Sequence, residues 1–149
     1  MSVPNESDFA LIKIGDGEAT ETFTAICGIE NVSINRTANT NDRFRRDCAT
    51  PPGQPAVRRS RTTGKQMDIT GTGGVDKASI ASFEAALGVV GNYEIELYQY
   101  DGTDTGTLMG TFAGAFNMTS ANLTLDANGD SSGEVTLASD GTWTWTAEA

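Results

Sequence analysis

The chain has 149 residues, 38% hydrophobic and 20% charged, and its ten basic and twenty acidic residues give a formal net charge of −10. This length fits a single domain, 1–149, and the composition excludes a wholly disordered chain. No apolar run approaches the ~20 residues that a membrane-spanning helix needs. The start, MSVPNESDF, lacks the features of a signal peptide, so we expect assembly in a cytoplasm. Cys27 and Cys48 are then expected to be free thiols rather than a disulfide.

Short segments of alternating polar and apolar residues open the chain. After a polar N-terminal arm over residues 1–8, the segments 9–15, 20–27 and 30–36 have the period-two pattern of half-buried strands. Turn residues such as Asp-Gly separate them. We therefore predict an early group of three strands.

The next segment carries a charge opposite to that of the remaining chain. Between Arg36 and Lys65 there are eight basic and two acidic residues, a formal charge of +6, which leaves −16 elsewhere. Residues 37–63 are rich in Asn, Pro and Arg and have no steady period, which predicts a long basic loop or a loosely paired hairpin. Loops of this length in compact domains are usually functional or flexible.

One helix is predicted, over residues 76–88. Asp76 can act as its N-cap, because a carboxylate accepts hydrogen bonds from the free amides of the first turn. A glycine at 88 or 91 would end the helix. The predicted apolar stripe consists of Ile80, Phe83 and Leu87.

Strands account for the remainder of the chain. In the segment 107–126 the apolar residues change phase, which predicts a bulge or break near Ser120. The other strands are predicted over 64–74, 92–100, 134–139 and 143–147. The predicted fold class is mainly β, a β-sandwich or barrel of about eight strands with one flanking helix.

The sequence excludes enzyme chemistry that depends on histidine, so acid–base chemistry would have to rest on carboxylates, lysine or tyrosine. The sequence has no histidine, which excludes Ser-His-Asp and Cys-His nucleophilic sites and histidine metal ligands. Glu94 and Glu96 share one strand face and could form a carboxylate pair, although a solvated outer face is the simpler interpretation. We expect no catalytic residue and no cofactor.

Two loops match ligand-binding motifs only in part. ITGTGGVDKAS places Asp76 where a dinucleotide-binding loop has its third glycine, and an acid there would repel a pyrophosphate. DANGDSSGE begins like a calcium loop, but Ser131 stands at the turn glycine and Leu137 at the bidentate acid. We therefore expect a helix cap and a hairpin connection, with a weak calcium site as the alternative for DANGDSSGE and no metal as the prediction.

Binding of nucleic acid and binding of another subunit compete as explanations of the basic segment. Single-strand binders interleave cations with aromatic residues, but this segment contains one aromatic residue, Phe44. A small nucleic-acid-binding β-barrel stays an alternative, as does a carbohydrate-binding β-sandwich that would use exposed Trp and Tyr residues. The candidates for subunit contact are Arg43, Phe44, Arg45, Arg46, Arg58, Arg59 and Arg61.

The order of these elements resembles the major tail tube proteins of long-tailed bacteriophages and of gene transfer agents. The shared features are the N-terminal arm, the long basic loop, the strand leading into ITGTGG, the helix DKASIASFEAALG, the strand YEIELYQY and the β-rich C-terminal third. The resemblance covers essentially the whole chain and rests on layout and composition. It implies a β-sandwich-like barrel flanked by a helix, with neither enzyme activity nor cofactor.

The resemblance also implies a structural role in the virion. Subunits would form hexameric rings that stack into a hollow tail tube, assembled in the host cytoplasm, through which genomic DNA passes without specific binding. The long loop and the terminal arm would reach neighbouring subunits, and the tape measure, tail-tip and terminator proteins would be further partners. Since an acidic wall repels phosphate and lets DNA slide, Glu94 and Glu96 are candidates for the lumen.

Overall fold

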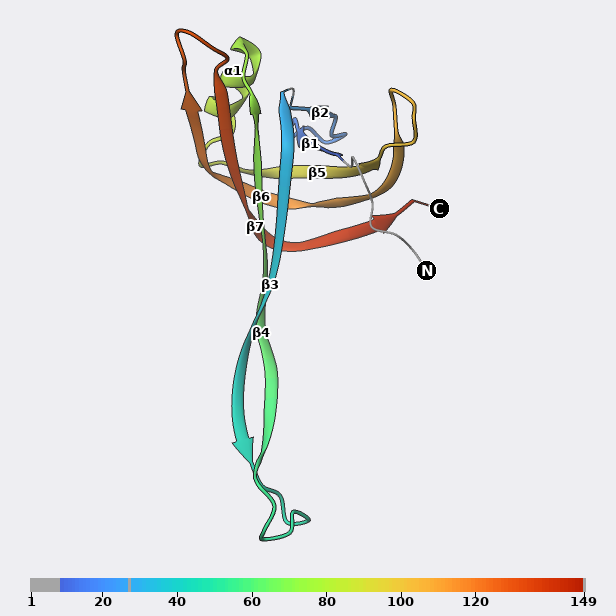
Figure 1. The fold of residues 1–149 in the computed structure, drawn as a ribbon, viewed down its shortest axis with the longest axis vertical. Coiled ribbons are helices and arrows are strands. Elements are labelled where there is room, and N and C mark those ends of the chain that lie inside the picture. The colour runs from blue at the N-terminus through green and yellow to red at the C-terminus, as the bar shows by residue number, and fades with distance from the viewer. Residues whose placement is uncertain (1–8, 27, 149) are drawn as a thin grey trace.

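The computed structural model of the chain describes residues 9–26 and 28–148, and these form seven strands and one helix (Figure 1). The helix α1 spans Lys77–Ala86. The predicted N-terminal arm, residues 1–8, lies outside the described residues, as does Cys27 and with it any pairing to Cys48. The strands are β1 (Phe9–Gly15), β2 (Phe23–Ala25), β3 (Ile29–Arg45), β4 (Val57–Gly74), β5 (Val90–Gln99), β6 (Thr107–Thr124) and β7 (Ser132–Ala147).

All seven strands of the described residues belong to one antiparallel sheet with the order β2-β1-β5-β6-β7-β4-β3. The mainly β class with one helix is confirmed. The two strands predicted over 134–139 and 143–147 are one strand, β7, because the ladder with β6 continues past an irregularity instead of ending there. Gly141, with φ +99°, lies in this irregularity, and glycine adopts that backbone conformation without steric cost.

The sheet bends where β6 and β7 are irregular, and the bend makes it sandwich-like (Figure 1). The predicted irregularity of β6 is confirmed, since the register shifts between Met118 and Ser120 and again between Gly114 and Phe116. The first half of β7 pairs with β4, whereas its second half continues along β6 only. The bend brings β1 close to β4, although the two strands are not neighbours in the sheet. A methyl group on Gly71 would lie 3.1 Å from the Cδ1 atom of Ile12.

The core lies inside this bend. The alternation in β5 is confirmed, since Tyr93 and Ile95 are buried, and the rings of Tyr93 and Phe116 meet edge to face with centroids 6.1 Å apart. Burying each such side chain contributes about 1.5–3 kcal/mol relative to leaving it exposed. The largest fully buried side chains are Tyr93, Phe116, Ile12, Met67, Ile69, Ile95, Met118, Leu137 and Val135.

The helix closes one end of the sandwich. Asp76 is its N-cap as predicted, and its Oδ1 accepts a hydrogen bond of 2.7 Å from the Ser79 amide. Phe83 is buried with 3% of its surface exposed, but the prediction for Ile80 and Leu87 was wrong, because both are exposed. The buried stripe is formed by Ser79, Phe83 and Ala86. At about 100° per residue, Ile80 and Leu87 lie on the flank of that stripe.

The segment predicted as a long basic loop or a loosely paired hairpin is a hairpin, a continuously paired two-stranded arm (Figure 1). Beyond the pair of Asp68 with Ala138 no third strand accompanies β3 and β4, yet their ladder continues from Thr37↔Gln66 to Arg45↔Val57. Only residues 46–56 connect the two strands at the tip. We call residues 37–66 the arm, and at ~3.3 Å per residue it extends roughly 25 Å before the tip.

Candidate subunit interface

The arm places its basic residues on two faces. Directly paired residues of antiparallel strands lie on the same face and successive residues alternate, so the register separates two sets. The arginine face contains Arg43, Arg45, Arg59 and Arg61, together with Val57. The opposite face, which we call the Phe44 face, contains Phe44 and its partner Arg58, together with Asp42 and its partner Ser60.

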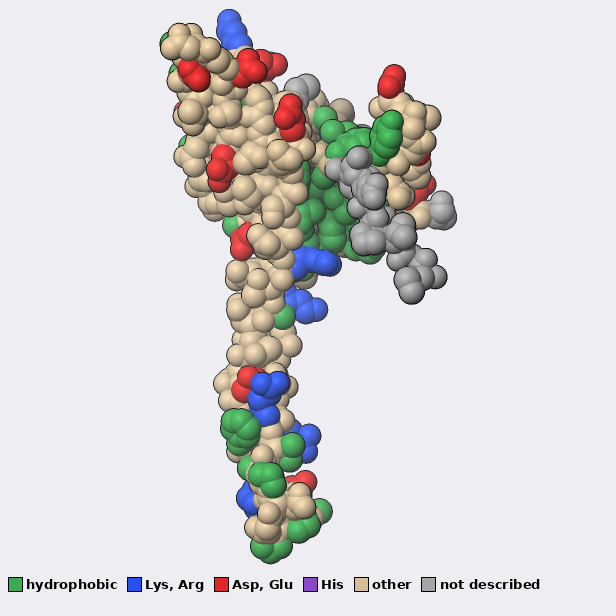
Figure 2. Space-filling view, viewed as in Figure 1, with side chains coloured by type: hydrophobic (Ala, Val, Ile, Leu, Met, Phe, Trp, Pro, Cys, Tyr) green, Lys and Arg blue, Asp and Glu red, His purple; other side chains and the backbone are tan. Residues whose placement is uncertain are grey.

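The arginine face concentrates positive charge without compensation from a neighbouring strand. Arg43 lies directly opposite Arg59, and like charges at directly opposite positions destabilise a hairpin. Arg43, Arg45 and Arg59 line an open groove of about 580 Å³ together with Val57. Figure 2 shows Lys and Arg side chains along the arm, whereas Asp and Glu side chains lie mostly over the body. Such an arm is suited to an acidic partner.

The tip of the arm is held by its own hydrogen bonds. The guanidinium of Arg46 donates to the carbonyl oxygens of Pro51 (2.6 Å) and Gln54. Asp47 Oδ1 accepts from the Thr50 hydroxyl at 2.8 Å, and this bond is the main cause that lowers the pKa of Asp47, with a smaller contribution from the charge of Arg59. Arg46 therefore shapes the tip, and the tip is more ordered than a loop without periodicity suggests.

The Phe44 face carries an aromatic ring with no cover in the described structure. Phe44 is 71% exposed, and the cation directly across from it is Arg58. Two-stranded hairpins are marginally stable in water by themselves, because they cannot bury a hydrophobic face. The arm thus presents an apolar group beside a cation on one face and a row of cations on the other.

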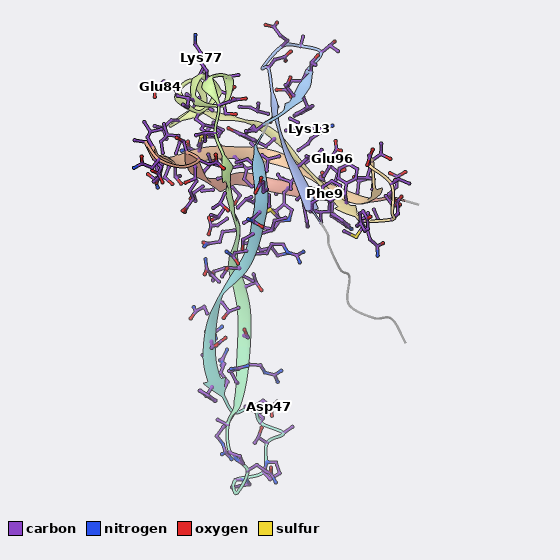
Figure 3. All side chains as sticks on the ribbon, turned by 45° about the horizontal axis from the view of Figure 1, so that its top comes forward. Phe9, Lys13, Asp47, Lys77, Glu84 and Glu96 are labelled. Carbon is purple, nitrogen blue, oxygen red and sulfur yellow. The ribbon has the colours of Figure 1, made fainter. Side chains whose placement is uncertain are left out.

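The two carboxylates proposed for the lumen differ in their surroundings, and Figure 3 labels Glu96 beside Lys13. Glu96 lies on the outer face of β5, where its Oε1 is 2.5 Å from the Nζ atom of Lys13 and its Oε2 accepts from the Tyr98 hydroxyl. Phe9 stacks on Tyr98 at a centroid distance of 5.2 Å. Glu94 lies on the same outer face, two residues away, and pairs with Lys13 in the backbone register. Glu96 is therefore half of an ion pair rather than an isolated negative charge.

The contacts among Lys13, Glu96 and Tyr98 shift the pKa of the carboxyl and that of the phenol. Burial raises the pKa of Glu96, but the hydrogen bonds from Lys13 and Tyr98 and the charge of Lys13 outweigh it, so that the pKa is lowered overall. The hydrogen bond to Glu96 raises the pKa of Tyr98 to about 12. Glu96 thus stays ionised and Tyr98 stays protonated over the whole neutral range.

Most of the aromatic residues that suggested carbohydrate binding are used in packing. Tyr93 is buried and Trp143 packs against the core. The ring of Trp145 lies 4.6 Å from that of Phe112, at a tilt of 44°. Arg36 covers the same Phe112 ring at 5.4 Å. Trp145 keeps 47% of its surface exposed and Tyr100 keeps 58%, so these two rings stay accessible.

The two motif-like loops have structural roles. In ITGTGG, a methyl group on Gly73 would lie 1.8 Å from the Gly28 carbonyl oxygen, so glycine permits the close approach of β3 and β4. In DANGDSSGE, Asp126 Oδ1 accepts from the Asn128 amide at 2.9 Å within the β6–β7 connection. Among the described residues no group of three or more Cys, Asp or Glu side chains is arranged to hold a metal. The one described helix is too short to span a membrane.

Sequence reasoning missed two groups of surface residues. Lys13 neutralises Glu96. The alternation of polar and apolar residues in β1 and β5 placed both side chains on outer faces, but it did not indicate the register that brings them together. Val89 and Val90 follow Gly88, between the end of the helix and the start of β5, and are 57% and 51% exposed. In the sequence, Gly88 followed by two adjacent valines was the available signal for an apolar surface at this end of the body.

Comparison with known proteins identifies the fold. No family model matches the chain, and no curated protein sequence is significantly similar. The tail of an empty gene transfer agent particle, refined with C6 symmetry, matches with a TM-score of 0.64 and 24% identity, over 92% of this chain and 95% of that chain. The SPP1 tail tube matches with a TM-score of 0.60 and 13% identity, over 97% and 80%.

A third match is the sheath–tube complex of an extracellular contractile injection system, with a TM-score of 0.63 and 19% identity over 99% of this chain and 95% of that chain. The matches extend over nearly the whole chain, including the bent sheet, the helix and the region of the arm. The chain therefore has the fold of tail tube proteins.

Proposed function

We propose that the protein is a structural component of a tail tube, with no enzyme activity. Its subunits form rings, most simply of six, and the rings stack into a hollow tube through which DNA is delivered. The observation that carries this proposal is the fold similarity to tail tubes over more than nine-tenths of the chain, one of them with C6 symmetry. The location in a virion tail and contacts with proteins that begin and end the tube belong to the same proposal.

The arm supports this assembly by its geometry and charge. It leaves the body as a free ribbon with side chains exposed on both faces, so folding of one subunit gives it little stability. Its arginines bind carboxylates well, because the planar guanidinium can donate two parallel hydrogen bonds. The remainder of each neighbour carries a formal charge of −16. The arginine face therefore binds an adjacent subunit.

The charge of the body suits a channel for DNA. A net negative wall repels phosphate, so the duplex passes without binding. Glu94 and the Lys13–Glu96 pair lie on the outer face of β1 and β5, which is the face available to line a lumen. In that position Glu94 supplies repulsion, whereas the pair contributes little net charge.

Two assays on one set of samples distinguish this function from nucleic-acid binding. Sedimentation of the purified protein measures assembly, and a gel shift with duplex and single-stranded DNA measures binding. We expect pelletable tubes whose amount falls with added salt, since ion pairs at exposed sites are screened, and no DNA retention at physiological salt. Tight DNA binding by a protein that stays monomeric would support the nucleic-acid-binding barrel instead.

A further inference from the structure

The Phe44 face needs a cover that the arginine contacts do not provide. A two-stranded ribbon has two faces, and Phe44 with Arg58 lies on the face opposite Arg43 and Arg59. A neighbour bound to the arginine face leaves the Phe44 ring in water. Exposed aromatic rings beside a cation are typical of binding surfaces, because burying a ring contributes more than burying most other side chains.

The described surface has one groove with complementary chemistry at the opposite end of the molecule. It lies between α1, the turn after β1 and the start of β5, and has a volume of about 420 Å³. Its apolar lining includes Ala86, Val89 and Val90, and its rim includes the carboxylates of Asp16 and Glu21. Figure 3 shows α1, with Lys77 and Glu84, at the end far from Asp47 at the arm tip.

We propose that Phe44 of one copy docks into this groove of a second copy. The ring would cover Val89 and Val90, and Arg58 beside it would lie near Asp16 and Glu21, so apolar and charged groups match at the same time. Glu21 is held in place by the Asn92 amide, which donates to its Oε2 at 2.9 Å. This inference rests on the proposed tube, and it names the surface that receives the second face of the arm.

The proposed contact joins different surfaces of the two copies. A heterologous contact forms a ring where the rotation closes and an open filament where it does not. Between stacked rings the proposed contact would repeat along the tube axis and give the assembly a direction. One end of a tube would then expose unoccupied Phe44 faces, and the other end would expose empty grooves. A protein that caps the groove end would need an apolar group beside a cation.

Cross-linking between two populations of subunits tests the contact directly. Both populations carry Cys27→Ser and Cys48→Ser; one also carries Ser60→Cys, which lies on the Phe44 face and leaves Phe44 in place, and the other carries Ser82→Cys in the lining of the groove, both at exposed positions. They are mixed, assembled and treated with a short bismaleimide. We expect a cross-linked dimer in the mixture and none in either population alone. Matched control pairs are Val57→Cys with Ser82→Cys, on the arginine face, and Ser60→Cys with Leu125→Cys, at another exposed apolar site.

The possible outcomes separate this inference from the tube itself. Tubes with a dimer band well above both control pairs support the docking of Phe44. Tubes with a band no stronger than the controls overturn it and leave the tube function standing. Failure of the unmodified protein to assemble overturns both. As a second readout, Phe44→Ala should raise the protein concentration needed for assembly by about tenfold or more, and an unchanged concentration would count against the contact.

Discussion

Reversal of one charge on the arginine face should have opposite effects on the free subunit and on the assembly. In the free arm Arg59 lies directly opposite Arg43, so the two cations repel each other. The substitution Arg59→Glu converts this repulsion into an attraction within the arm. The same substitution removes the attraction between Arg59 and Asp47, which offsets part of this gain. The stability of the free subunit should therefore change little, whereas every contact that uses the arginine face should weaken.

The magnitudes follow from exposed ion pairs. A directly opposite charge pair in a ribbon contributes about 0.2–1 kcal/mol, which bounds the gain in the free arm. At the interface the variant loses one exposed ion pair of about 0.2–1 kcal/mol and adds a repulsion of similar size. The sum of about 0.4–2 kcal/mol per contact corresponds to a roughly 2- to 30-fold rise in the concentration needed for assembly.

The assay compares the melting temperature at a concentration too low for assembly with the critical concentration obtained by sedimentation. The control is Lys77→Glu, which makes the same change in net charge at an exposed position of α1, away from the arm. Assembly of Arg59→Glu at the normal concentration would refute the docking role of the arginine face. An equal defect in Lys77→Glu would show that the net charge of the subunit matters and the arginine face does not.

Three further predictions concern the body. Phe83→Ala should lower the free energy of unfolding by about 3–5 kcal/mol, because removal of a ring that is 3% exposed leaves a cavity. The melting temperature should then fall by roughly 6–20 °C, at about 2–4 °C per kcal/mol. The control Ile80→Ala, at a position 37% exposed, should change the melting temperature little. Because the pKa of Glu96 is lowered, ionised Glu96 stabilises the fold above its ordinary pKa of 4.5, and this stabilisation is lost as the pH falls through the lowered pKa. In urea titrations Glu96→Gln should therefore be less stable than the unchanged protein at pH 7, and the difference in stability should disappear in acid. A difference that stays constant with pH would contradict this. Glu94→Lys should leave tube length unchanged in micrographs while reducing DNA delivery, and normal delivery would exclude Glu94 from the wall.

The sequence predicted the parts of the fold that have a buried face. Tyr93 and Ile95 alternate with polar residues because one side of β5 packs on the core, and Asp76 was recognisable because capping depends on local chemistry. The sequence alone predicts the arm as a loop or a loosely paired hairpin, because both of its faces are exposed. No hydrophobic period therefore marks its strands, although Thr and Arg are compatible with extended backbone.

The candidate interface was predicted as a set of residues without its geometry. The clustering of arginines is visible in the sequence, but the division into two faces depends on the register of β3 with β4, including the irregularity between Asn39 and Thr40. The groove that we propose for Phe44 joins residues near 16, 86 and 90, which only the folded sheet brings together. Arg46, predicted as an interface residue, has its guanidinium engaged within the tip.

Cryo-electron microscopy of the purified, assembled protein tests the central claim most directly. We expect hollow tubes of stacked six-membered rings in which the arm of each subunit contacts another subunit through its arginine face. Monodisperse single subunits at high concentration, even with tail-tip proteins present, or assemblies in which the arms extend freely into solvent, would contradict it.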